Sequence, residues 1–198
     1  MTGSRRTPWP SAWARWGWVW LAALAAGAAW AVDDRPVDTA DTPETELRTK
    51  AAYLYKFGAF VDWPAKAFPS ADAPVVIALF EADALADELS LVVGGRRLQG
   101  RPVAVRKLHA GDPMAGVHVL FVGRGADPQD ALSLVRGQPV LTVADTALPS
   151  TVRSMIRFQM IDGRLRFDVS LKAAEQASLG ISARLLAVAH HVDTGTAP

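Results

Sequence analysis

Four histidines are the residues of this sequence best suited to acid–base or metal chemistry near neutral pH. His190 and His191 are adjacent, and adjacent side chains on a helix point about 100° apart, so this pair is poorly placed to chelate one ion. His118 stands inside an apolar run, where we expect a hydrogen-bonded core histidine. The sequence has no Gly-x-Ser-x-Gly and no His-Glu-x-x-His, and its lack of cysteine excludes thiol catalysis and disulfides. It therefore predicts no catalytic residue, no metal site and no cofactor.

Two groups of residues suit binding better than catalysis. Lys50 leads a stripe at helical spacing that continues through Tyr53, Phe57 and Phe60, and two further cations stand seven residues apart near the C-terminus, on one face of an expected final helix. Aromatic rings beside cations can bind a ring-bearing or anionic ligand, or form an interface, and the alternative is that these rings belong to the core. The predicted partner-binding or ligand-binding residues are Lys50, Tyr53, Phe57, Arg184 and His191.

The second group is a basic segment between Ser90 and Gly111 that contains no acidic residue. Charged residues at the edge of a sheet prevent unwanted strand pairing, so a solvated edge is the plainer interpretation. The alternative is a surface complementary to an acidic partner. The five basic residues are Arg96, Arg97, Arg101, Arg106 and Lys107.

The first 31 residues differ in composition from the rest of the chain. They hold six of the seven tryptophans and three arginines, but no acidic residue. The uncharged stretch Trp16 to Trp30 ends in Ala29-Trp30-Ala31, which predicts a secretory signal peptide cleaved after Ala31, by a Sec or Tat route that stays open. A retained anchor is the alternative, but the stretch is shorter than the roughly 20 residues of a membrane span. Cleavage would place the remainder outside the cytoplasm.

The remainder of the chain has the composition of one globular domain. Half of all residues are hydrophobic, and residues 32–198 carry slightly more acidic than basic groups, which argues against a nucleic-acid partner. Residues 32–43 are acidic and contain proline, so we expect a flexible linker there. The predicted domain covers residues 44–193, and residues 194–198 are predicted to be a disordered tail.

Hydrophobic periodicity predicts the elements of this domain. A first helix should begin near Asp41 to Glu44 and end at Pro64, burying a stripe that includes Ala51, Leu54 and Val61. Short apolar runs then alternate with helical patterns, which is typical of a mostly parallel sheet with helices on both faces. The expected strands cover 75–80, 103–105, 117–122 and 140–143, and the expected helices cover 82–92 and 128–136.

The pattern of alternating strands and helices ends before the C-terminal part of the chain. Asp162-Gly163 separates the alternating runs 154–161 and 164–170, which predicts a tight β-hairpin. The tail should be helical, interrupted near Leu179-Gly180. Its expected inward residues are Ile181, Leu185, Val188, Ala189 and Val192. The predicted fold class is therefore α/β: a three-layer αβα sandwich with a mostly parallel central sheet and a C-terminal β-hairpin plus helix.

The segment Lys50 to Pro64, KAAYLYKFGAFVDWP, resembles the opening motif of the YfiR family of periplasmic proteins. The resemblance continues in the same order over Leu47 to Val192. Its later blocks are Val75 to Phe80, His118 to Val122, Val140 to Asp145, Ile156 with Phe158, Arg166 to Val169, Lys172 to Ala174 and Leu179 to Leu186. Members of the family usually carry cysteines, whereas here Val117 precedes His118 and control through disulfides cannot apply.

The resemblance implies a periplasmic regulator without enzymatic activity. Such a protein binds the periplasmic sensor region of an inner-membrane diguanylate cyclase and represses it, lowering cyclic di-GMP and biofilm formation. An outer-membrane lipoprotein and a second copy of the chain are the other partners that it implies. The alternative function is a periplasmic small-molecule-binding module, with its ligand near Lys50, Tyr53 and Arg184.

Overall fold

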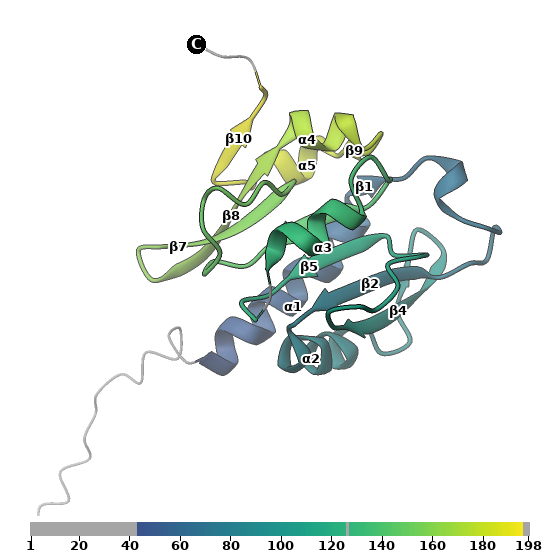
Figure 1. Ribbon diagram of the computed structural model, residues 1–198, viewed down its shortest axis with the longest axis horizontal. Coiled ribbons are helices and arrows are strands. Elements are labelled where there is room, and N and C mark those ends of the chain that lie inside the picture. Colours follow the sequence, from purple (N-terminus) through teal and green to yellow (C-terminus); the bar gives the residue numbers. More distant parts are fainter. Residues whose placement is uncertain (1–42, 126, 196–198) are drawn as a thin grey trace, which may run out of the picture. The chain divides into compact units, whose positions relative to one another are not determined.

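The computed structural model describes residues 43–125 and 127–195 (Figure 1). The predicted signal peptide, its cleavage site and almost all of the predicted linker lie outside the described residues, as do the last three residues. The helical elements are α1 (Pro43–Ala59), η1 (Ala65–Ala67), α2 (Asp83–Val93), α3 (Pro128–Leu134), α4 (Leu171–Gln176) and α5 (Ala183–Leu186). The strands are β1 (Val61–Asp62), β2 (Val75–Phe80), β3 (Arg97–Leu98), β4 (Arg101–Leu108), β5 (Val119–Val122), β6 (Leu141–Ala144), β7 (Ile156–Ile161), β8 (Arg164–Ser170), β9 (Gly180–Ile181) and β10 (His191–Asp193).

An eight-stranded sheet in the order β10-β8-β7-β6-β5-β2-β4-β3 forms the centre of the domain. Strands β4, β2, β5, β6 and β7 run parallel to one another, and β10 is parallel to β8. Only the pairs β7–β8 and β3–β4 are antiparallel within this sheet. The prediction of a mostly parallel sheet is therefore confirmed.

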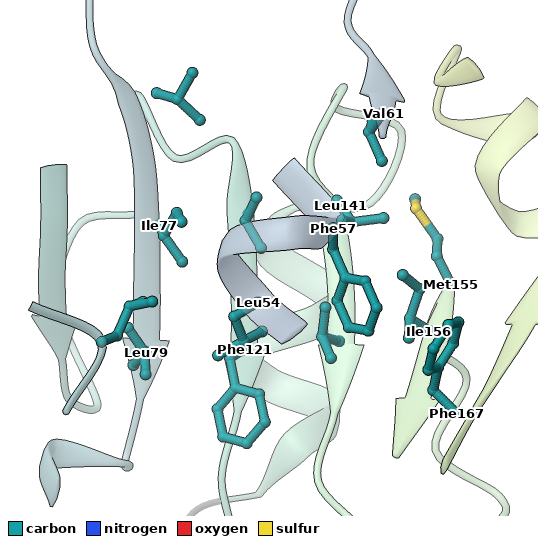
Figure 2. Close-up of a cluster of buried hydrophobic side chains, with 14 of the residues drawn as sticks. Leu54, Phe57, Val61, Ile77, Leu79, Phe121, Leu141, Met155, Ile156 and Phe167 are labelled. Atoms are coloured by element: carbon teal, nitrogen blue, oxygen red, sulfur yellow. The ribbon is translucent and has the colours of Figure 1, made fainter. Parts of the chain in front are cut away.

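Both faces of the central strands are apolar, because each face is covered by helices. On one face α1 and α2 pack on Ile77, Phe121 and Ile156, with Leu54 and Phe57 of α1 pointing into this core (Figure 2). On the other face α3 covers alternate residues of the same strands, in a second cluster of buried side chains. This cluster includes Ala78, Phe80, Leu120, Val122, Ala131, Val135 and Ala144. The predicted three-layer arrangement is confirmed.

Helix α1 ends at Ala59, five residues before Pro64, where the sequence predicts its end. The chain leaves the helix because Val61 and Asp62 form β1, which pairs with β9, and Phe60 accepts a hydrogen bond from the Ser182 amide at 2.9 Å. Gly58 allows the last turn to approach β3 closely, since a Cβ there would lie 2.7 Å from Cδ1 of Leu98. A pairing with residues 120 positions away has overridden the local helical pattern.

The β7–β8 hairpin is confirmed, and its turn residues Asp162 and Gly163 both have positive φ, as a type I′ turn requires. The helical tail is confirmed only in part: α4 and α5 flank the expected interruption near Leu179-Gly180, but residues 180–181 and 191–193 form the short strands β9 and β10. His190 donates its amide hydrogen to Phe167 at 2.8 Å, and β10 then adds to the sheet beside β8. Val188, predicted to face inward, is 64% exposed.

Candidate partner-binding surface

Lys50 is buried inside the fold, whereas its place in the sequence predicts a residue that contacts a partner or ligand. Its side chain is 4% exposed, and its Nζ lies 2.5 Å from Oε1 of Glu46 and 2.5 Å from Oδ1 of Asp145. Asp145 follows β6 directly and also accepts the Thr146 amide at 2.6 Å, while Arg124 Nε lies 3.5 Å from its second oxygen. The ion pair therefore joins α1 to the carboxyl end of β6.

The sequence alone did not identify Asp145 as the partner of Lys50, because 95 residues separate the two. The available signal was the lysine itself, since a cation on an otherwise apolar helix face needs a buried counter-charge. Any of several aspartates at strand ends could have supplied it.

Tyr53 and Phe57 belong to the core, as the alternative interpretation expected. Phe57 is fully buried, and its ring centroid lies 4.9 Å from that of Phe167 and 5.6 Å from that of Phe158. Tyr53 is partly buried and stacks on Phe57 at 5.8 Å. These rings fix the β7–β8 hairpin against α1, and thereby position the side chains on the opposite face of the hairpin.

Arg184 and His191 do not share a helix face, because they lie on α5 and on β10. Both side chains are exposed. His191 pairs in register with Asp168 of β8, so the two side chains point to the same side of the sheet. Of the five predicted binding residues, these two are available to a partner.

His118 is the core histidine that the sequence predicts, at 3% exposure. Its Nδ1 accepts the Val76 amide at 3.2 Å, so Nε2 must carry the hydrogen that it donates to the Ala67 carbonyl at 3.1 Å. Its ring stacks on Phe68 at 4.4 Å, and the Arg101 guanidinium covers the other face of Phe68 at 3.8 Å. Burial lowers the pKa of His118, although the Ala67 hydrogen bond acts in the opposite direction.

The five basic residues of the β3–β4 edge all have partners within the chain. Arg101 donates to the carbonyls of Ser70 at 2.9 Å and Ala73 at 3.0 Å, and Lys107 lies 2.7 Å from Asp87. The others donate to backbone carbonyls (Arg97, Arg106) or cover the Tyr55 ring (Arg96). These contacts favour the interpretation as a charged sheet edge.

A different surface is left without a covering layer. Phe158, Phe167 and Val169 turn toward α1, so alternate residues of the same strands turn to the opposite side, and the seven-residue α3 packs over β2, β5 and β6 instead. We call this side of β7, β8 and β10 the open face. It carries Arg157, Gln159, Ile161, Arg164, Arg166, Asp168, Ser170, His191 and Asp193.

Two neighbouring hollows lie along the open face. The larger, of about 1060 Å³, lies between α3, the loop 150–155, α4 and β10, with Arg157, Asp168 and His191 in its lining. The smaller, of about 690 Å³, follows at the hairpin tip and is lined by Arg164, Arg166 and the segment 187–190. Along β8, the outward residues Arg164 and Arg166 thus line the smaller hollow, and Asp168 and Ser170 line the larger one.

Arg157 holds the wall of the larger hollow. Its guanidinium donates to the Leu148 carbonyl at 3.0 Å and also to the Val152 carbonyl, which fixes the loop after β6. Burial lowers the pKa of Arg157, and the nearby Asp168 carboxylate opposes this shift. Asp168 accepts a hydrogen bond from Gln159 on Oδ2, whereas its buried Oδ1 has no hydrogen-bond partner. Such a buried unpartnered oxygen is uncommon in folded proteins.

The sequence of the hairpin strands contains a signal for this surface. Polar side chains occupy alternate positions of both hairpin strands, at Arg157 and Gln159 and again at Arg164, Arg166 and Asp168. A strand covered on both faces would be apolar at these positions, as β5 is.

A family model described as YfiR/HmsC-like matches residues 48–190, which run from the first turns of α1 to the residue before β10. No curated protein matches the chain. Among the described residues, no helix is long and apolar enough to cross a membrane. Because the matched region covers well over half of the chain, the protein belongs to the YfiR/HmsC-like family.

Proposed function

We propose that this protein is a non-enzymatic periplasmic regulator that binds the periplasmic sensor region of an inner-membrane diguanylate cyclase and holds that cyclase inactive. The observation that carries the proposal is membership of the YfiR/HmsC-like family, which suggests a periplasmic regulator of diguanylate cyclase signalling. The repression step, its direct binding mode and the lowering of cyclic di-GMP are our proposal for this chain.

The uncovered surface supports a binding role. A sheet face lined with charged groups, hollowed and flanked by exposed His191, offers a partner both shape and polar contacts. We propose His191, on this face, and the exposed Arg184 of α5 as contacts with the partner. Lys50, Tyr53 and Phe57 support the same surface from within, through the Asp145 ion pair and the rings of the hairpin.

Repression by binding is a shift between two states of the cyclase. A regulator moves that equilibrium only by its differential affinity for the two states, and a shift from 1:99 to 99:1 needs about 10⁴-fold tighter binding to the inactive state. The regulator therefore acts stoichiometrically and is not consumed.

The small-molecule alternative has less support at the position that the sequence suggests. Nζ of Lys50 already contacts two carboxylates, and Tyr53 packs against three phenylalanine rings. A ligand near Lys50, Tyr53 and Arg184 would have to displace these internal contacts.

The test uses right-side-out membrane vesicles loaded with GTP and Mg²⁺ that contain a full-length diguanylate cyclase of the same bacterium with a periplasmic segment. We expect cyclic di-GMP synthesis to fall as the purified protein is added on the periplasmic side, reaching its minimum at a fixed molar ratio. The isolated cytoplasmic cyclase domain serves as control and should not respond. Inhibition of that isolated domain, inhibition at far below stoichiometric amounts, or no binding to any such cyclase contradicts the proposal.

A further inference from the structure

We propose that the open face binds an extended segment of a protein partner in which acidic residues occupy alternate positions. This inference rests on the proposed function and specifies the chemistry of the partner. It follows from the charge of the two hollows, the spacing of the cations along β8 and the composition of the face.

The two hollows carry more basic than acidic residues, whereas residues 44–193 as a whole are close to charge balance, with 17 basic and 16 acidic residues. Six arginine or lysine residues line them against three aspartates. The basic residues are Arg136, Arg153, Arg157, Arg164, Arg166 and Lys172, and the acidic residues are Asp162, Asp168 and Asp193. Lys107 of the β3–β4 edge already has a carboxylate partner in Asp87, whereas the excess of basic residues in the hollows favours an acidic partner on the open face.

The spacing favours an extended segment. Arg164 and Arg166 point to the same side of β8 two residues apart, which corresponds to about 6.8 Å. Side chains at alternate positions of an extended peptide have the same repeat, so one carboxylate can meet each guanidinium. Residues 168–170 of β8 line the larger hollow, and Arg164 and Arg166 of the same strand line the smaller one, nearer the hairpin tip between β7 and β8.

The composition favours protein over single-stranded nucleic acid. The outward residues of β7, β8 and β10 include no Phe, Tyr or Trp on which bases could stack. Ile161 and the 64% exposed Val188 instead provide an apolar contact in the smaller hollow. Gln159 and Ser170 offer neutral hydrogen-bonding groups suited to a peptide backbone.

The experiment measures binding of three fluorescein-labelled probes to the purified protein by anisotropy. The probes are a decapeptide of five Asp-Thr repeats, a decapeptide of five Asp followed by five Thr, and the oligonucleotide (dT)10. We expect the alternating peptide to bind at least about tenfold more tightly than either of the others. Equal binding of the two peptides, tighter binding of the oligonucleotide, or no binding at about 1 mM protein overturns the inference.

The charge-reversed double variant Arg164→Glu/Arg166→Glu should lose at least about tenfold in affinity for the alternating peptide. The matched control is Lys56→Glu/Lys66→Glu, which makes the same charge change at two exposed lysines outside the hollows. The control should bind within about twofold of the parent, and thermal melts verify that both variants are folded. Equal loss in both variants would mean that only net charge matters, and would overturn the inference.

The two proposals fail in different ways. If the cyclase segment binds the parent and Arg164→Glu/Arg166→Glu equally well, the open-face inference is wrong and the proposed function stands. If the alternating peptide binds as described while no cyclase segment binds, the surface assignment stands and the proposed function is wrong.

Discussion

Replacing Lys50 with methionine tests whether this residue is a structural element of the core. Methionine keeps most of the volume and removes the charge, leaving Asp145, at 7% exposure, without its nearest cation. Removing one partner of a buried ion pair costs about 3 to 5 kcal/mol, because the other charge stays buried. Asp145 still has the Thr146 amide and the 65% exposed Arg124, so we expect the lower end, about 3 kcal/mol.

Urea unfolding followed by circular dichroism measures this loss as a lower midpoint with an unchanged m-value. In a domain of this size about 3 kcal/mol corresponds to a melting temperature lower by roughly 6 to 12 °C. Lys56→Met, at an exposed position of the same helix, is the control and should stay within about 0.5 kcal/mol of the parent.

The double variant Lys50→Met/Asp145→Leu removes both charges and should recover much of the lost stability, since an apolar pair can replace a buried ion pair at little cost. A parent-like midpoint for Lys50→Met would refute the reasoning. It would mean that Lys50 is solvated in solution, as the sequence analysis assumed when it placed this residue in a binding site.

Three further changes probe the fold. Burial lowers the pKa of His118, so as the pH falls the unfolded chain binds this proton before the folded chain does, and the free energy of unfolding should fall below about pH 6.5. In urea melts between pH 7.5 and 5.5, His118→Asn should show a shallower fall than the parent. Identical slopes for the two proteins would contradict this. Gly163→Ala should cost about 1 kcal/mol, since φ is 68° in the hairpin turn. Gly94→Ala is the control, because φ is −38° there and an added Cβ would approach no atom closer than 3.5 Å. Equal effects on the melting temperature would argue against a type I′ turn. Leu54→Ala should cost about 2 to 5 kcal/mol by calorimetry, because the side chain is fully buried between α1 and the sheet, and a loss below about 1 kcal/mol would be inconsistent with this packing.

The sequence by itself determined the elements that depend on neighbouring residues. The apolar runs of β2, β5 and β6, the helical patterns of α2 and α3 and the Asp162-Gly163 turn are local signals, and all were found within a few residues of their places. Alternation of apolar strands with helices then led to the αβα arrangement. The motif around Lys50 to Pro64 led to the family, which the match over residues 48–190 supports.

Only the tertiary structure decided which distant residues meet. Lys50 finds Asp145 across 95 residues, and the tail leaves its helical pattern because β8 presents a free edge to His191, Val192 and Asp193. The early end of α1 has the same cause, in the pairing of β1 with β9. Local patterns differ by tenths of a kcal/mol per residue, whereas strand pairing and burial of a charge each involve larger free energies set by partners far along the chain. The open face also depends on tertiary structure. The seven-residue α3 does not cover the β7–β8 hairpin, and the alternate polar residues of the two hairpin strands lie side by side only once the sheet is assembled.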